Sequence, residues 1–155
     1  MLFDPVFEDR CSPFSWIGPK RVTDIPCKIS EIPAIDLVVI SHNHYDHLSY
    51  HTVKEIAQRH PRCHFFAPLR NKAWFNEVGI HQMTELDWWE ECDVRLSPSD
   101  AKNPDDDSSL PAEIHAQIGC VPCQHTSNRG VFDRGKTLWA SWCIESGGKK
   151  VYFAG

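Results

Sequence analysis

The segment from residue 42 to residue 47 holds four side chains of the kind that bind metal ions: His42, His44, Asp46 and His47. Neutral imidazole and carboxylate groups are common ligands of zinc and of similar divalent ions. In an extended loop the side chains at positions i and i+2 point the same way, so His42 and His44 can converge on one ion. Asp46 and His47 lie just beyond and can serve a second ion, and two ions ~3.5–4 Å apart polarise a phosphoryl oxygen and activate a bridging water. This density of ligand-type residues favours a metal site over a chance group of polar residues.

The elements around this segment place it at the edge of a sheet. A short apolar run precedes it and suits a strand that is buried on both faces. Apolar positions then recur at helical spacing, and a second strand and helix follow. In open α/β sheets, binding sites lie beyond the carboxyl ends of the strands, which is where this loop falls. The sequence thus predicts strands at residues 35–40 and 64–67 and helices at residues 49–60 and 71–78, which is an α/β pattern.

The two ends of the chain differ from this middle part. The first 35 residues are rich in proline, which removes hydrogen-bond donors from a sheet, and they predict an irregular arm. Ser146, Gly147 and Gly148 suit a hairpin turn between the last two predicted strands. No linker divides the chain, so we expect one domain of layered α+β structure over residues 1–155. The second half predicts strands at residues 94–96, 113–121, 137–144 and 149–153 and an acidic surface loop at residues 101–111.

Composition and charge limit the classes of function. The chain has 155 residues, of which 41% are hydrophobic, enough to build the core of one domain. Its net charge of −5 and its scattered basic residues argue against nucleic acid as a partner. No apolar run approaches the ~20 residues that span a bilayer, and the start of the chain lacks the features of a signal peptide. We therefore expect a cytoplasmic protein, with any membrane contact peripheral.

The sequence contains seven cysteines at irregular spacing. The odd number, without a secretion signal, favours free thiols in a reducing compartment over a disulfide framework. Cys120 and Cys123 form a C-x-x-C pair, but the chain has no second pair for a zinc ribbon. The pair also falls at a predicted strand end rather than at a helix start, where a redox motif would lie. We interpret Cys120 and Cys123 as structural thiols.

The motif H-x-H-x-D-H at residues 42–47 resembles the signature of the metallo-β-lactamase superfamily. Within it, the chain is similar to the N-acylphosphatidylethanolamine-hydrolysing phospholipases D, in the stretches FDPVFEDRCSPFSWIGPKR, PCKISEIPAIDLVVISHNHYDHLSYHTV and ELDWWEE. The resemblance covers nearly the whole chain. It implies an αββα sandwich with two zinc ions at one edge. It also implies a phospholipid substrate, whose phosphodiester is cleaved by a metal-bound hydroxide to an N-acylethanolamine and phosphatidic acid.

Residue by residue, the resemblance assigns His42 and His44 to the first metal. It assigns Asp46 and His47 to the second metal and to catalysis. The first metal needs a third histidine at a strand end downstream, and His125, which follows a predicted strand, fits this place. Taken alone, His125 would be interpreted as a polar residue in a turn. Neither the sequence nor the resemblance indicates substrate-binding residues or an oligomeric state.

The family pattern continues as F-A-G-D-T-G, in which the aspartate bridges both metals, whereas this sequence reads Phe153-Ala154-Gly155 and stops. The bridging aspartate, the final histidine of the second metal and the early strands of the family are therefore expected outside the chain. We expect the central part of the sandwich, with one or two zinc ions. It is either a fragment of a longer protein or a truncated product with impaired activity. Two rivals stay open: a hydrolase of the same fold that acts on a lactone or another phosphodiester, and a non-catalytic relative.

Two further groups of residues allow two interpretations each. Trp88 and Trp89 either line a surface that faces lipid or divide between the core and a sheet edge. Arg129, Arg134 and Lys136 follow His125 and either attract an anionic phosphate or lie in a solvated turn.

Overall fold

Successive side chains of the first predicted strand reach two separate hydrophobic cores. In the computed structural model, which describes residues 1–14, 16–97 and 113–155, this strand is β2 (Leu37–Val39). Leu37 and Val39 pack in one core, whereas Val38 and Ile40 pack in the other. Since successive side chains of a strand point to opposite faces, a strand that is apolar at every position must be covered on both sides.

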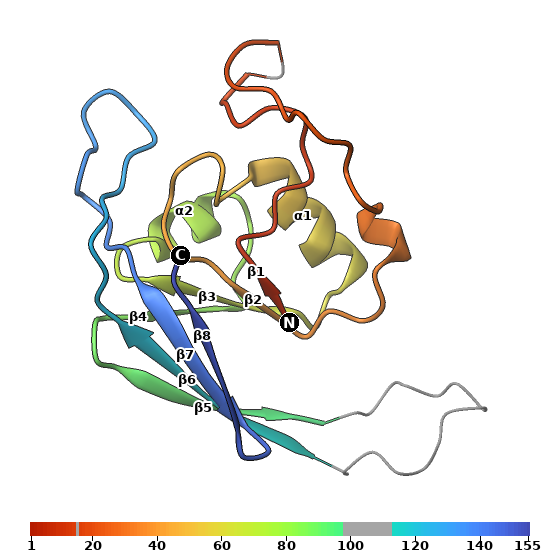
Figure 1. The fold of residues 1–155 in the computed structure, drawn as a ribbon, viewed down its shortest axis with the longest axis vertical. Helices are drawn as coiled ribbons and strands as arrows, with labels where there is room; N and C mark the ends of the chain where they lie inside the picture. The colour runs from red at the N-terminus through yellow and green to blue at the C-terminus, as the bar shows by residue number, and fades with distance from the viewer. Residues whose placement is uncertain (15, 98–112) are drawn as a thin grey trace.

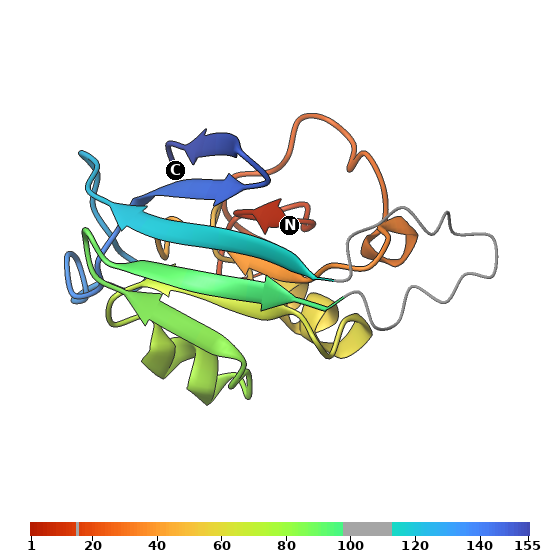
Figure 2. The same cartoon turned by 90° about the horizontal axis from the view of Figure 1, so that it is seen from below.

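β2 belongs to a parallel sheet with the order β1-β2-β3-β4, which stacks on an antiparallel sheet with the order β5-β6-β7-β8 (Figures 1 and 2). The core between the sheets includes Phe66, Ile118 and Trp142. The other strands are β1 (Leu2–Phe3), β3 (His64–Pro68), β4 (Met83–Leu86), β5 (Glu91–Leu96), β6 (Ile114–Val121), β7 (Ser141–Ser146) and β8 (Lys149–Phe153).

Two helices cover the other face of the parallel sheet (Figure 1). α1 (Tyr50–Arg59) begins where the Ser49 side chain accepts a hydrogen bond from the backbone N–H of Thr52. α2 (Lys72–Glu77) follows β3, and the 3-10 turn η1 (Ile29–Glu31) precedes β2. Helices, parallel sheet and antiparallel sheet form successive layers, which confirms the expected layered α/β class and a partial αββα sandwich.

The structure confirms the predicted order of strand, helix, strand and helix in the first half, and it corrects other details. β1 lies in the arm predicted to be irregular, where Leu2 pairs with Val38 of β2. β4, with the sequence Met-Thr-Glu-Leu, pairs with β3 and was absent from the predicted elements. Trp139 precedes β7 rather than lying within a strand. The predicted acidic loop at residues 101–111 lies outside the described residues.

The ends of β1 and β8 meet beside the start of the loop that connects β2 to α1. The rings of Phe3 and Phe153 lie 4.8 Å apart, centroid to centroid. Beyond β8, a Cβ atom on Gly155 would come within 2.8 Å of the Ser41 Cβ, and the φ of Gly155 is +84°. Glycine is the residue that fits both the close approach and this backbone conformation. The end of the second sheet therefore touches the loop that carries the predicted metal ligands.

All seven cysteines lie in described parts of the chain, and all are free thiols, as expected. Cys120 is buried, and its Sγ donates to the carbonyl oxygen of Leu86 at 3.6 Å. Burial raises the pKa of the Cys120 thiol to about 12, which agrees with a structural role. Among the described residues, no helix has the length and apolar character needed to cross a bilayer.

Candidate metal centre

The histidine loop (residues 41–49) connects β2 to α1 at the carboxyl end of the parallel sheet. His42, close to the end of β2, is 2% exposed. The backbone N–H groups of His47 and Leu48 donate to the carbonyl oxygen of His44 at 3.0 and 2.8 Å, so the loop turns back on itself. This turn brings the ring of His47 to 4.1 Å from that of His42, measured between centroids.

Three imidazole nitrogens meet where the histidine loop faces the segment after β6. His42 Nε2 lies 2.8 Å from His44 Nδ1 and 2.9 Å from His125 Nε2, and the other two nitrogens are 3.3 Å apart. A tetrahedral zinc ion with bonds of ~2.0–2.1 Å holds pairs of ligand nitrogens ~3.3 Å apart. The histidine triangle, formed by His42, His44 and His125, is close to that size. The structure thus brings together the three residues assigned to the first metal, and their role as ligands stays a prediction.

The charge states of His42 and His44 suit metal binding. Ser41 Oγ bonds both the Asp4 carboxylate and His42 Nδ1, the latter at 2.8 Å. A hydroxyl that donates its one hydrogen to Asp4 must accept from His42 Nδ1–H, which leaves the lone pair of His42 on Nε2. Burial, followed by the neighbouring histidines, lowers the pKa of His42 to about 3, and burial also lowers the pKa of His44. Both rings are neutral at neutral pH, as metal ligands must be.

Asp4 is a site residue that the sequence analysis missed. Its Oδ1 accepts from the backbone N–H of Ser41 at 2.7 Å, and its Oδ2 lies 2.7 Å from His47 Nδ1. The φ of Asp4 is +39°, which is uncommon for a residue other than glycine, and strained positions of this kind cluster at functional sites. With His42 and His47 it forms a second group of potential ligands whose atoms all lie within 4.8 Å of one another. No local pattern connects residue 4 to residue 47, so only the fold reveals this group.

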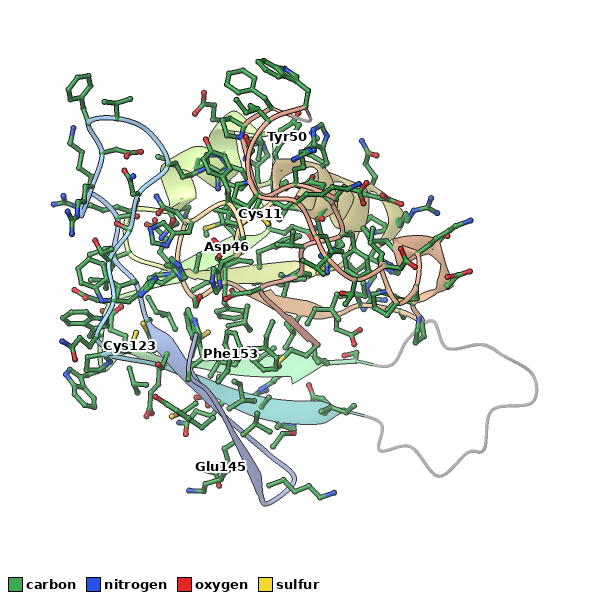
Figure 3. The ribbon with its side chains drawn as sticks, turned by 45° about the horizontal axis from the view of Figure 1, so that its top comes forward. Cys11, Asp46, Tyr50, Cys123, Glu145 and Phe153 are labelled. Carbon is green, nitrogen blue, oxygen red and sulfur yellow. The ribbon has the colours of Figure 1, made fainter. Side chains whose placement is uncertain are left out.

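Asp46 and His47, the pair assigned to the second metal, lie at the rim of the site. The hydrogen bond to Asp4 is the main cause that raises the pKa of His47, and burial opposes it. Because His47 Nδ1 is engaged by Asp4, Nε2 is its remaining ligand atom, and it lies 3.7 Å from Asp46 Oδ2. The Asp46 side chain is 62% exposed, and it lies near Cys11 (Figure 3), whose thiol pKa is raised first by burial and then by this carboxylate. The assignment of the pair to a second metal stays a prediction.

One arginine holds the histidine loop against the segment that carries His125. Arg129 Nη1 donates to the carbonyl oxygens of Asn43 and Leu48 at 3.0 and 2.6 Å, and the guanidinium carbon lies 4.2 Å from the centre of the Tyr45 ring. Arg129 is partly buried, and burial lowers its pKa. Arg129 does not lie in a solvated turn, because its guanidinium contacts protein groups. Its interpretation as a group that attracts a phosphate stays a prediction.

The structure also shows the surroundings of the other basic residues of this segment and of the tryptophan pair. Arg134 and Lys136 are exposed, which is compatible with both a solvated turn and the attraction of a phosphate. Trp88 packs against the core between the sheets, and its Nε1 donates to the carbonyl oxygen of Trp139 at 2.7 Å. Trp89 is 75% exposed. The tryptophan pair therefore divides between core and surface.

Comparison with known proteins supports the same classification. A family model described as the beta-lactamase superfamily domain matches residues 1–155. The chain belongs to the metallo-β-lactamase superfamily. With the histidine triangle at the edge of its sheets, this superfamily domain has the architecture of a metal-dependent hydrolase and a histidine cluster that could hold a metal ion.

Several curated superfamily members are similar to the chain over nearly all of its length. It is 35% identical, over 98% of its residues, to N-acyl-phosphatidylethanolamine-hydrolyzing phospholipase D 1 of Caenorhabditis elegans. It is 31% identical, over 99% of its residues, to the mitochondrial N-acyl-phosphatidylethanolamine-hydrolyzing phospholipase D of Saccharomyces cerevisiae. It is 37% identical over its whole length to an uncharacterized protein of Mycobacterium tuberculosis. The chain spans 40%, 29% and 37% of the lengths of these three proteins, respectively.

Proposed function

We propose that the chain forms the zinc-binding part of a phosphodiester hydrolase of the phospholipase D type. The proposed substrate is N-acylphosphatidylethanolamine, which water cleaves to an N-acylethanolamine and phosphatidic acid. The observation that carries the metal is the histidine triangle, with sides of 2.8, 2.9 and 3.3 Å. The substrate class is supported by the printed names of the nematode and yeast relatives.

The geometry of the site supports the following proposed roles. We assign one ligand nitrogen each to His42, His44 and His125, which leaves one position of a tetrahedral ion open. A zinc ion held there supplies Lewis acidity, which activates water and polarises a phosphoryl oxygen. His42 is buried whereas His125 is exposed, so the site opens toward solvent on the side of His125, where a substrate can approach.

Asp46 and His47 are proposed to hold a second ion beside the first. Asp4 orients His47 through Nδ1 and leaves Nε2 and the exposed Asp46 carboxylate as the available ligand atoms. A second ion would share the charge that develops on the phosphoryl group.

The test measures zinc content and the release of N-acylethanolamine from detergent-dispersed N-acylphosphatidylethanolamine by the full chain. We expect His42→Ala to lose both, because the buried nitrogen at the apex of the triangle is removed. His81→Ala changes an exposed histidine outside the cluster and should leave both unchanged. Bound zinc and full hydrolysis in folded His42→Ala would contradict the proposed site.

A panel of substrates at one fixed zinc load separates the proposal from its rivals. Faster turnover of a lactone or of another phosphodiester would replace the proposed substrate and keep the site. Zinc bound with turnover of none of them would favour a non-catalytic relative.

A further inference from the structure

Two loops project beyond the helices at the same end of the molecule, one on each side of the histidine loop (Figure 1). The arm loop comprises residues 10–14 and 16–22, and the distal loop comprises residues 128–136. In Figure 1 the arm loop is red to orange, the distal loop is blue, and the gold histidine loop lies between them. Whatever surface these loops touch therefore faces the candidate metal centre.

The arm loop is closed at its base and holds apolar side chains outward. The backbone N–H of Cys11 donates to the carbonyl oxygen of Pro19 at 3.1 Å, and Arg10 Nη1 donates to that of Gly18 at 2.7 Å. Between these bonds, the exposed large apolar side chains are Phe14 (54%), Trp16 (73%) and Ile17 (50%). The rings of Phe14 and Trp16 lie 5.8 Å apart, so these two aromatic side chains form one exposed apolar pair.

The distal loop is also internally braced. The Asp133 carboxylate accepts from the backbone N–H groups of Arg129 and Gly130 at 2.8–3.2 Å. This arrangement closes a turn whose tip is Val131 and Phe132, each 87% exposed. The hydrogen bonds of the turn hold these two apolar side chains out in the solvent. Exposed apolar groups of this kind mark interaction surfaces.

Positive charge accompanies both apolar tips. Residues 10–22 contain three basic and no acidic residues, in a chain whose net charge is −5. Lys20 of the arm loop is exposed, and so are Arg134 and Lys136 of the distal loop. Basic side chains beside apolar and aromatic ones are the composition of segments that lie at the surface of anionic bilayers. Tryptophan in particular favours the boundary between lipid and water.

We propose that the arm loop and the distal loop together dock the chain onto the surface of an anionic phospholipid bilayer, with the metal centre facing the lipid headgroups. This inference rests on the proposed function, since a phospholipid substrate lies in such a surface. A symmetric contact between two copies through these loops would bring like-charged basic side chains together, whereas an anionic bilayer offers them opposite charge. With the loops on both sides of the histidine loop, this favours a bilayer over a second copy of the chain. Phe14, Trp16, Ile17, Val131 and Phe132 enter the interface, and Lys20, Arg134 and Lys136 contact the headgroups.

The test compares binding of the zinc-loaded full chain to sedimentable vesicles of phosphatidylcholine mixed with phosphatidylserine and to vesicles of phosphatidylcholine alone. The double variant Trp16→Ser with Phe132→Ser should bind the mixed vesicles about ten-fold more weakly, because both apolar anchors are lost. Lys20→Gln with Arg134→Gln should weaken binding to the mixed vesicles only. Trp89→Ser is the matched control, since Trp89 is equally exposed but lies on the turn between β4 and β5.

Two outcomes would overturn the docking surface. One is equal vesicle binding by the native chain, the double variant and the Trp89 control. The other is a change from dimer to monomer in the double variant, which would make the loops a contact between copies of the chain.

Hydrolysis separates this inference from the proposed function. The double variant should cleave detergent-dispersed N-acylphosphatidylethanolamine at the native rate and vesicle-embedded substrate about ten-fold more slowly. Vesicle binding that depends on the loops, without cleavage of this lipid in either form, would sustain the docking surface and remove the proposed substrate. An equal loss of rate in both forms would instead contradict a role limited to docking.

Discussion

Asp4 determines the orientation of two histidines at once, because its carboxylate bonds His47 Nδ1 directly and reaches His42 through Ser41. Asp4→Asn replaces one acceptor oxygen with a donor group that faces other donors. We expect zinc affinity to fall about 10- to 100-fold, the usual effect of losing a group that orients metal ligands. We also expect the pKa of His47 to fall, since its bond to Asp4 is the main cause that raises it. Chelator competition gives the affinity, and NMR titration of the metal-free chain gives the pKa.

Asp36→Asn is the control for this experiment. Asp36 precedes β2 in the same sheet, and its variant also loses one carboxylate, without touching the histidines of the site. The control matches the loss of charge and not the burial, since Asp36 is exposed whereas the Asp4 side chain is 7% exposed. Equal zinc affinities for the two variants would remove Asp4 from the account of the site. A fall in affinity with no change in the pKa of His47 would point to a general loss of structure instead.

The buried His42 also makes the stability of the metal-free chain depend on pH. Its pKa is lowered from 6.5 to about 3 in the folded chain, so the unfolded chain binds more protons than the folded chain below about pH 6.5. The free energy of unfolding therefore decreases as the pH is lowered. His47 has the opposite sign, because its raised pKa stabilises the folded chain at low pH and that contribution is lost as the pH rises. Between about pH 7 and about pH 5, above most carboxylate titration, His42 alone should remove about 2 kcal/mol. Denaturant unfolding with a chelator present measures this loss of stability. If a His42→Gln variant lost as much stability between these pH values, His42 would not be the cause.

The residues of the site differ in how well the sequence alone predicts them. His42, His44, Asp46 and His47 are recognisable because the ligands share one loop and their types and spacing suffice. Asp4 is 37 residues from its partner Ser41, and Arg129 is 86 residues from Asn43. Those contacts depend on how the sheets stack, and no local pattern carries that information.

At the scale of elements, the histidine loop keeps its shape because Arg129, in the connection between β6 and β7, donates hydrogen bonds to two carbonyl oxygens of the loop. Arg129→Met leaves the carbonyl oxygens of Asn43 and Leu48 without that donor in a partly buried setting. We expect a loss of about 1.5–3 kcal/mol in the free energy of unfolding. Denaturant unfolding of the zinc-loaded chain measures it. Arg134→Met, in the same loop but exposed, should change stability by less than about 0.5 kcal/mol.

Substrate kinetics would distinguish this structural role from the phosphate contact first considered for Arg129. A phosphate ligand would raise KM in Arg129→Met and leave the free energy of unfolding near its native value. That result would contradict the bracing role.

The helices and strands were predictable where the apolar pattern agrees with residues that begin or end an element. β2, α1, β3 and α2 combine apolar runs with a serine cap and with Pro61 and Gly79 as stops. β1 spans only two residues and exists because β2 offers it an edge. β4 reads Met-Thr-Glu-Leu, a weak strand pattern that the neighbouring β3 converts into a strand by pairing. Such tertiary pairing overrides local preference, which is why these two strands escaped the sequence analysis.

At the scale of the whole molecule, the histidine triangle joins the two sheets. His42 and His44 follow β2 of the parallel sheet, and His125 follows β6 of the antiparallel sheet. A zinc ion bound to all three therefore ties the layers together and stabilises the folded chain by about 2.7 kcal/mol when free zinc is 100-fold above its dissociation constant. Thermal unfolding with and without zinc, at constant protein concentration, measures this gain.

His125→Ala isolates the contribution of the second sheet to this stabilisation. Because His125 is exposed, its removal should change the stability of the metal-free chain little, yet it should abolish most of the gain from zinc. His81→Ala, also exposed but outside the triangle, should keep the full gain. A zinc-dependent shift that survives in His125→Ala would place the ion on the histidine loop alone and separate metal binding from the stacking of the sheets. Its loss in His125→Ala alone would show that the stacked sheets and the metal site form together.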